Sequence, residues 1–229
     1  MTIRRTGDGS STLYSERYGQ TFHSLHGAVS ESRHVFLTGS GVAGRLAAGQ
    51  PSRVLEIGFG TGLNCWLTAD AALAGGAELE LISLEQAVLP AAVLRGLEFG
   101  SVLQQPQLLE EYLAFRESLP EVVPAGRFSV KLGPQVQLAL LVGEAASQEL
   151  PTDWADAVYH DAFSPDANAE LWTEEFLRQL QRALVPAGTL VTYSVKGEVR
   201  RRLQQLGFVV RKQPGPEGGK REMLVARRQ

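Results

Sequence analysis

The amino-acid sequence predicts an α/β fold in which helices cover both faces of a doubly wound, mostly parallel sheet that ends in an antiparallel hairpin. Three observations predict it. Short apolar runs alternate with helix-like stretches, glycines at alternate positions follow one of these runs, and only a short turn-rich link separates the last two. Apolar strands that alternate with helices are typical of sheets that are buried on both faces.

The expected strands and helices follow one another in regular order. Strand-like runs lie at 53–58, 79–85, 128–133, 136–142, 155–161, 188–195, 207–212 and 222–228. Helix-like stretches lie at 63–74, within 87–117, at 173–184 and at 197–206. In the third of these, Phe176, Leu177 and Leu180 repeat at helical spacing, which predicts a helix that packs by one stripe. The last two strands must pair antiparallel, because their link is too short for a crossover helix.

Bulk composition predicts one domain. The chain has 229 residues, of which 44% are hydrophobic and 21% charged, and these values are typical of one compact globular unit. We expect a polar N-terminal arm or extension over 1–50 and the α/β core over 51–229. Cys65 is the single cysteine, which rules out an internal disulfide and favours a cytoplasmic location. The sequence shows no signal peptide and no apolar stretch long enough to span a membrane.

Charge is distributed unevenly along the chain. The segment 196–229 carries ten Lys or Arg against three Glu, a balance of +7, so the rest of the chain carries −10 within the overall −3. Arg200 and Arg201 are expected to point outward from a helix, and Lys220 and Arg221 form a second basic pair. This pattern predicts docking of an anionic partner such as a phosphate backbone. An ordinary solvated face is the alternative.

The glycine-rich segment after the first core strand predicts a ligand site. Gly58, Gly60 and Gly62 would let a ligand approach the backbone closely, as expected of a Rossmann-like sheet. A dinucleotide fingerprint would place its third glycine at position 63, where Leu63 stands, so NAD and FAD are disfavoured. The spacing instead resembles the S-adenosylmethionine-binding loop of class I methyltransferases, and Glu56 and Asn64 complete the candidate set. A turn without a ligand is the alternative.

Acidic residues at the ends of two further strands extend this site. Glu85 ends its strand 25 residues after Gly60, where a carboxylate can accept hydrogen bonds from a ribose diol. Gly143 and Glu144 follow the strand at 136–142, where class I methyltransferases often place an acid or amide near the adenine amino group. Ordinary strand-end acids remain the alternative for both.

The strand at 155–161 runs into D-A-F-S-P, which looks like a variant of the acidic-or-amide, proline, aromatic loop of amino-group methyltransferases. Asp161 is therefore the candidate catalytic residue, expected to orient an acceptor amine, and both Asp161 and Phe163 are candidate donor contacts. Strand alternation places Tyr159 and Asp161 on one side and His160 on the other, and we interpret His160 as a packed or hydrogen-bonded histidine. No histidine shows metal-ligand spacing.

Several segments together resemble one bacterial enzyme family. In chain order they are YGQTFHS, ESRHVFL, RVLEIGFGTGLN, LISLEQAVLP, HDAFSPDANAELWT, PAGTLVTYSVKGEVRRRLQQLGF and GKREML. They are similar to the methyltransferase half of the tRNA 5-methylaminomethyl-2-thiouridine biosynthesis proteins. Two departures are mild: Glu144 stands where that family usually has Asp, and D-A-F-S-P replaces D-G-F-A-P.

The resemblance implies a reaction. The family domain uses S-adenosylmethionine to methylate the aminomethyl group of the tRNA wobble uridine, so tRNA is the expected partner. Its bifunctional form carries an FAD-dependent oxidase domain that makes the aminomethyl substrate. Because this chain ends at Gln229, it resembles the stand-alone form, so we expect neither FAD nor a metal and anticipate cooperation with precursor-making enzymes. Methylation of a small amine or a protein, and a non-catalytic module, are the alternatives.

Overall fold

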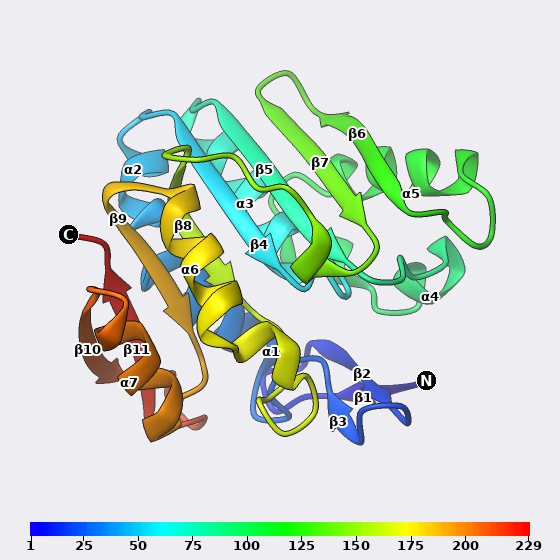
Figure 1. Cartoon of the computed structure of the whole chain (residues 1–229). Helices are drawn as coiled ribbons and strands as arrows, with labels where there is room; N and C mark the ends of the chain where they lie inside the picture. The colour runs from blue at the N-terminus through cyan, green and yellow to red at the C-terminus, as the bar shows by residue number, and fades with distance from the viewer.

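The computed structural model describes residues 1–229 and contains two sheets (Figure 1). A three-stranded sheet has the order β1-β2-β3, and an eight-stranded sheet has the order β10-β11-β9-β8-β4-β5-β7-β6. The strands are β1 Thr2–Arg5, β2 Ser11–Ser15, β3 Gln20–Thr21, β4 Ser52–Ile57, β5 Leu79–Glu85, β6 Gly126–Leu132, β7 Val136–Val142, β8 Ala155–His160, β9 Leu184–Thr192, β10 Val209–Pro214 and β11 Glu222–Arg227.

Helices fill most of the connections between these strands. They are α1 Ala28–Glu31, α2 Val42–Ala47, α3 Leu63–Gly75, α4 Ala91–Arg95, α5 Gln107–Ser118, α6 Glu174–Ala183 and α7 Gly197–Gln205. A π-helical stretch covers Ser32–Thr38, and short 3-10 turns lie at Phe99–Val102, Ala145–Ser147 and Ala169–Trp172. None of the helices is long and apolar enough to cross a membrane.

The large sheet has a parallel centre and antiparallel edges. β4 pairs in parallel with β5 and β8, β5 with β7, and β8 with β9. β11 pairs antiparallel with both β9 and β10, which confirms the predicted C-terminal hairpin. β6 and β7 form a second antiparallel hairpin that the sequence analysis did not foresee. It turns through Gly133, whose φ of +69° suits a residue without a side chain.

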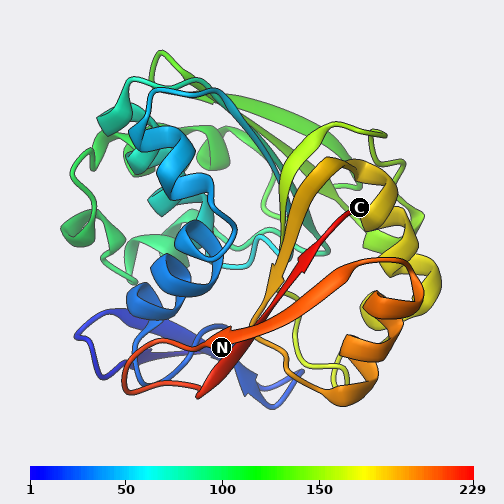
Figure 2. The same cartoon turned by 90° about the vertical axis from the view of Figure 1, so that its left-hand side faces the viewer.

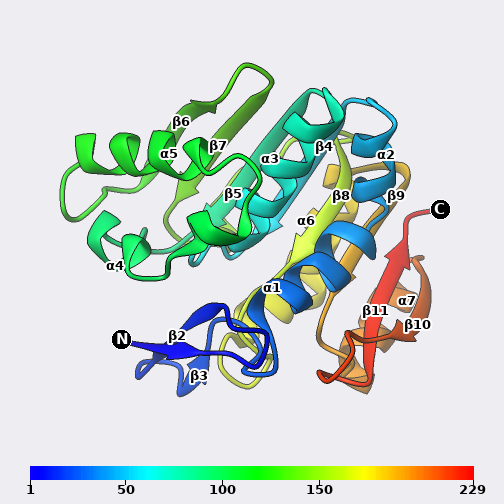
Figure 3. The same cartoon turned by 180° about the vertical axis from the view of Figure 1, so that it is seen from behind.

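Helices cover both faces of the large sheet, as predicted. α6 and α7 pack on the face toward the viewer in Figure 1, and α1 to α5 lie on the opposite face, seen in Figure 3. α6 begins where Thr173 Oγ1 accepts a hydrogen bond from the Phe176 backbone N–H. Its buried stripe includes Phe176, Leu177 and Leu180, as the residue spacing predicted.

The N-terminal segment is more structured than the polar arm expected from its sequence. It holds β1 to β3, α1, the π-helical stretch and α2, and it runs along one side of the large sheet (Figure 2). Leu13 and Phe36 are buried in the same apolar cluster as Trp66 and Tyr112 from the core. The segment's strands and helices are too short to give a clear periodicity, which is why sequence reasoning missed them.

β9 differs from its prediction at both ends. It begins at Leu184 and ends at Thr192, whereas 188–195 was expected, and its register with β8 shifts between Ala155 and Ala157. Tyr193 therefore lies beyond the strand.

Candidate active site

A cavity opens where the carboxyl ends of the central parallel strands meet. Its volume is about 430 Å³, and the residues that follow β4, β5, β7 and β8 line it. The strand order reverses here, because β5 and β8 flank β4 on opposite sides. Such a switch point is where open α/β sheets bind ligands. Residues from the N-terminal segment line the other side of the cavity.

The glycine-rich loop after β4 forms one wall of the cavity. Gly58 and Gly60 both line it, with φ values of +90° and +52°. A Cβ atom on Gly58 would lie 2.8 Å from the backbone oxygen of Asp161, so the close approach of the two loops requires glycine. Gly62 does not line the cavity. It has a φ of +76° directly before α3, and a Cβ atom there would collide with Trp66.

Glu85 joins the glycine loop to the end of β5. Its Oε2 accepts a hydrogen bond of 2.8 Å from the Gly60 N–H, and its Oε1 accepts one of 3.0 Å from the Ala87 N–H. Burial raises the pKa of this carboxyl, while these backbone N–H groups act in the opposite direction. Each oxygen keeps a second lone pair. Glu85 therefore fixes the loop and can also accept hydrogen bonds from a ligand in the cavity.

Gly143 and Glu144, after β7, also line the cavity. Glu144 Oε1 accepts a hydrogen bond of 2.7 Å from Gln86 Nε2, and Gln86 Oε1 accepts one of 3.3 Å from the Tyr18 hydroxyl. This chain of contacts connects the acid after β7 to the N-terminal segment.

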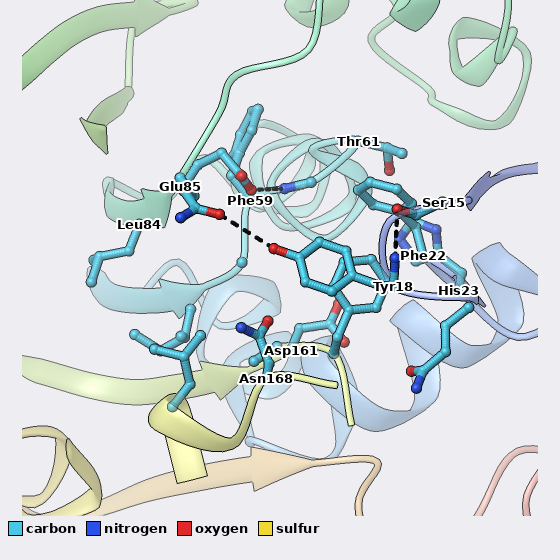
Figure 4. Close-up of a pocket in the computed structure, with 18 of the residues that line it drawn as sticks. Ser15, Tyr18, Phe22, His23, Phe59, Thr61, Leu84, Glu85, Asp161 and Asn168 are labelled. Atoms are coloured by element: carbon cyan, nitrogen blue, oxygen red, sulfur yellow. Dashed lines mark hydrogen bonds between the residues drawn. The ribbon is translucent and has the colours of Figure 1, made fainter. Parts of the chain in front are cut away.

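Aromatic side chains line the cavity beside the loop that follows β8. Phe163 stacks on Tyr18 with ring centroids 4.3 Å apart, and it makes a T-shaped contact with Phe22 at a centroid distance of 5.2 Å. Gln20 Nε2 donates a hydrogen bond of 2.7 Å to Ser164 Oγ, which ties the N-terminal segment to this loop. In Figure 4, Tyr18 and Phe22 are drawn in the same cavity as Glu85 and Asp161.

Asp161 is held in place from behind by buried polar side chains. Asn64 Nδ2 donates a hydrogen bond of 2.8 Å to Asp161 Oδ2. Burial first, and then the charge of Glu31, raise the pKa of the Asp161 carboxyl well above its usual range. Glu56 and Asn64 do not line the cavity, so the structure brings them to the site as supports for Asp161 and not as cavity walls.

Glu56 is fully buried and incompletely hydrogen-bonded. Its Oε2 accepts a hydrogen bond of 2.5 Å from Ser83 Oγ, whereas Glu56 Oε1 and Asn64 Oδ1 have no partner. Burial raises the pKa of Glu56 to about 7, with Asn64 among the groups that oppose the shift. Burial therefore favours the neutral acid form of Glu56 in the folded protein.

The histidines near the site are packed and neutral. His160 Nε2 lies 2.9 Å from the backbone oxygen of Leu171, and its ring packs on Trp172 with centroids 4.1 Å apart. Burial lowers the pKa of both His160 and His23 to about 4. The interpretation of His160 as a packed, hydrogen-bonded strand residue is confirmed. The structure contains no group of three or more His, Cys, Asp or Glu that could hold a metal ion.

The predicted basic residues occupy different positions. Arg200 and Arg201 are exposed on α7, and Arg221 is exposed in the link between β10 and β11. The neighbouring Lys220 is exposed overall, but it lines the cavity and its Nζ lies 3.8 Å from the ring centroid of Tyr193.

Sequence reasoning missed several cavity residues, namely Tyr18, Phe22, Glu31 and Tyr193. Tyr18, Phe22 and Glu31 lie in two N-terminal segments that carry the family resemblance. That resemblance was the available signal, but it said nothing about which side chains face a ligand. Tyr193 lies in another segment that carries the resemblance, but it was assigned to the expected strand at 188–195, so nothing placed it in the cavity.

Comparison with known proteins identifies the family. A family profile described as S-adenosyl-L-methionine-dependent methyltransferase matches residues 107–229, which is more than half of the chain. The chain belongs to this methyltransferase family. The crystal structure of MNMC2 from Aquifex aeolicus is 32% identical to the methyltransferase described here, with a TM-score of 0.77, and the match covers 98% of this chain and 69% of that one. This agreement confirms the Rossmann-like class I methyltransferase fold.

Two curated relatives of this methyltransferase carry the name tRNA 5-methylaminomethyl-2-thiouridine biosynthesis bifunctional protein MnmC. The one from Thiobacillus denitrificans is 35% identical over 219 residues, covering 93% of this chain and 35% of the relative. The one from Pseudomonas aeruginosa strain PAO1 is 36% identical over 227 residues, covering 95% and 34%. The methyltransferase thus spans about a third of the length of the curated relatives it matches.

The residues present fit S-adenosylmethionine, the methyl donor of this family. Gly58 and Gly60 lie in the cavity wall at positions where a Cβ atom would collide with the Asp161 backbone or the Phe22 ring, and Glu85 offers acceptor lone pairs at the end of the neighbouring strand. Aromatic rings and acidic side chains elsewhere in the cavity suit a ligand that combines a purine with a positive charge.

Proposed function

We propose that this methyltransferase converts 5-aminomethyl-(2-thio)uridine at the wobble position of tRNA to 5-methylaminomethyl-(2-thio)uridine. One observation carries the proposal: nearly the whole chain matches proteins named for the biosynthesis of this nucleoside, at 35% and 36% identity. The extensive acidic lining of the cavity supports an acceptor that enters with a positive charge. We further propose that residues 1–229 form one domain that acts in the cytoplasm, on tRNA prepared by separate precursor-making enzymes.

The proposed donor contacts fall into two groups. Direct donor contacts are proposed for the cavity residues Gly58, Gly60, Glu85, Gly143 and Glu144. Asp161 and Phe163 also line the cavity and are proposed to contact the donor where it meets the acceptor. Glu85 would accept from the ribose hydroxyls and Glu144 would approach the adenine amino group. Glu56, Gly62 and Asn64 are proposed to act indirectly, by shaping the glycine loop and fixing the orientation of Asp161. When bound, S-adenosylmethionine supplies an electrophilic methyl group.

Asp161 is the proposed catalytic residue. A primary alkylamine has a pKa near the lysine value of about 10, so at neutral pH it arrives mostly as an ammonium without a free lone pair. The Asp161 carboxylate would accept a hydrogen bond from that ammonium. Once one proton has passed to solvent, it would hold one of the two remaining N–H bonds so that the lone pair points at the donor. The hydrogen bond from Asn64 restricts the carboxylate to one orientation.

The basic C-terminal segment is the proposed tRNA contact. Arg200, Arg201 and Arg221 are exposed and free to meet phosphates, and Lys220 was assigned to the same surface from its sequence. Lys220 differs from the other three because it lines the cavity.

The proposed function is tested by methylation in vitro. The purified protein is incubated with S-adenosylmethionine and tRNA that carries 5-aminomethyl-2-thiouridine, and the wobble nucleoside is analysed by mass spectrometry. We expect it to gain one methyl group, and tRNA that lacks the aminomethyl group should gain none. Transfer to free aminomethyl-uridine nucleoside or to a protein, with no transfer to tRNA, would instead support the small-amine or protein methyltransferase.

A further inference from the structure

Four side chains line one end of the cavity, and the proposed reaction gives a catalytic role to only one of them, Asp161. Glu31 ends α1, Asp161 follows β8, Tyr193 follows β9, and Lys220 lies in the link between β10 and β11. All four line the cavity, although they come from segments far apart in the sequence. We refer to Glu31, Asp161, Tyr193 and Lys220 as the amine cluster.

One member of the amine cluster, Lys220, is itself a cation. The Lys220 ammonium lies 3.8 Å from the centroid of the Tyr193 ring, within the range at which an aromatic face attracts a positive charge. Tyr193 is fixed in that orientation because its hydroxyl donates a hydrogen bond of 2.8 Å to the backbone oxygen of Ala162. The ring therefore presents a defined face to whichever ammonium group stands over it.

The two carboxyl groups of the cluster attract the Lys220 ammonium. Glu31 is only 7% exposed, and its Oε2 accepts a hydrogen bond of 2.8 Å from the Ser24 N–H. Burial raises the pKa of the Glu31 and Asp161 carboxyls, and the positive charge of Lys220 counteracts the rise in both. Because the buried Glu31 carboxylate and the partly buried Asp161 carboxylate repel each other, a neighbouring cation makes the cluster more favourable.

Lys220 is suited to be a displaceable occupant. It has a flexible four-carbon side chain and follows Gly218 and Gly219 in the link between the last two strands. Gly218 has a φ of +73°, a conformation that favours glycine. The lysine ammonium is also the same chemical group as the protonated amine of the proposed acceptor.

We infer that Glu31, Asp161 and the face of Tyr193 form the subsite for an alkylammonium group, and that Lys220 fills it as an internal stand-in until the acceptor amine displaces it. This inference rests on the proposed function for the identity of the acceptor, but it concerns binding alone. It adds Glu31 as an acceptor-binding residue and assigns Lys220 to the subsite instead of the tRNA surface.

Glu31→Gln tests the subsite. Glutamine keeps an oxygen that can accept the Ser24 N–H but loses the charge, and a hydrogen bond to a charged partner corresponds to roughly a tenfold or greater change in binding. We expect the KM for aminomethyl-uridine tRNA to rise about tenfold while the Kd for S-adenosylmethionine changes less than about twofold. The matched control is Glu175→Gln, which removes a charge at an exposed position on α6. A change in donor Kd with an unchanged acceptor KM would overturn the inference, since the cluster would then bind the donor's own ammonium.

Lys220→Met tests the stand-in. Removing the Lys220 ammonium should lower the acceptor KM by about two- to fivefold, the size expected for an exposed cation–π contact. The control is Lys131→Met, at an exposed position on β6, which should have no effect. A KM that rises in the Lys220 variant would show that this lysine binds the tRNA and does not compete with its amine.

Binding of a small probe separates this inference from the proposed function. Propylammonium chloride is titrated against the protein by saturation-transfer NMR, with 1-propanol as the neutral probe at matched ionic strength. We expect propylammonium to bind more tightly in Lys220→Met and more weakly in Glu31→Gln than in the unchanged protein. If these shifts occur but tRNA is not methylated, the proposed function is wrong and the subsite stands. If tRNA is methylated but both variants bind propylammonium like the unchanged protein, the subsite is wrong.

Discussion

The two ends of the cavity are built in different ways. The donor end consists of residues at or shortly after the ends of strands in the parallel sheet, such as Gly58, Gly60 and Glu85. The amine cluster instead combines Asp161 with Glu31 from the N-terminal segment and Tyr193 and Lys220 from beyond β9 and β10. The donor end is thus specified by the neighbouring ends of parallel strands, whereas the acceptor end requires segments brought together by the whole fold.

The largest effect is expected on stability, from replacing Glu56, which is fully buried and does not line the cavity. Its pKa is raised from 4.5 to about 7, so the folded state favours the neutral acid. The stability that protonation of Glu56 contributes is therefore complete below pH 4.5 and is lost as the pH rises toward 7. Glu56→Gln mimics the neutral acid. Relative to the unchanged protein, its free energy of unfolding without donor should rise by about 3 kcal/mol between pH 4.5 and pH 8.

Urea unfolding across this pH range measures the Glu56 effect. Glu175→Gln, whose carboxyl is exposed on α6, should show no such pH dependence relative to the unchanged protein. A constant difference in stability between the Glu56 variant and the unchanged protein at all pH values would mean that Glu56 is ionised in the fold.

The acceptor end is tested by Asp161→Asn. The variant keeps the shape and one acceptor oxygen but loses the charge, so turnover should fall about 100-fold, as is typical for one positioned acid–base group, with little change in donor affinity. Asp166→Asn, an exposed acid in the same loop, is the control and should retain its activity. Full activity in the Asp161 variant, or a defect limited to donor binding, would remove the catalytic role.

The donor end is tested by Glu85→Gln. An amide has one oxygen, so it cannot accept from both the Gly60 and Ala87 N–H groups and also receive the ribose hydroxyls. The Kd for S-adenosylmethionine, measured by calorimetry, should rise about tenfold or more. Glu80→Gln, an exposed acid within the same strand β5, controls for the loss of charge. Unchanged donor affinity in the Glu85 variant would disprove its assignment to the ribose.

The smallest expected effect concerns the surface beyond the acceptor end. Neutralising both Arg200 and Arg201 should lower the salt dependence of tRNA binding by about two units of slope if each contacts a phosphate. The paired replacement of Arg4 and Arg127, both exposed on strands β1 and β6, controls for overall charge. An unchanged slope in the Arg200 and Arg201 variant would leave these residues as part of a solvated face.

The donor end could be predicted from the sequence because its signals are local. Alternating glycines after a buried strand, and an acid at the end of the next strand, need only the rule that parallel strands end at the same edge. Gly58, Gly60 and Glu85 were found in this way and lie on the cavity wall. Glu56 and Asn64 were found by the same pattern, but their burial behind Asp161 depends on side-chain packing that no spacing rule specifies.

The acceptor end could not be predicted because its signals are not local. Glu31 is an acid in a short helix, and Lys220 is one basic residue among several, so charge counting placed Lys220 on a tRNA surface. Tyr193 was assigned to a strand because β9 was predicted to start and end a few residues too late. Only the fold shows that these side chains meet Asp161 in one cavity.

The division of the cavity into a donor end and an acceptor end is tested most directly by combining Glu85→Gln with Glu31→Gln. Donor Kd and acceptor KM are measured for both single variants and for the double variant. We expect Glu85→Gln to raise only the donor Kd, Glu31→Gln to raise only the acceptor KM, and the double variant to show both changes with a coupling below about 0.5 kcal/mol. If either variant alters both constants to a similar extent, the two ends are one site and the account is contradicted.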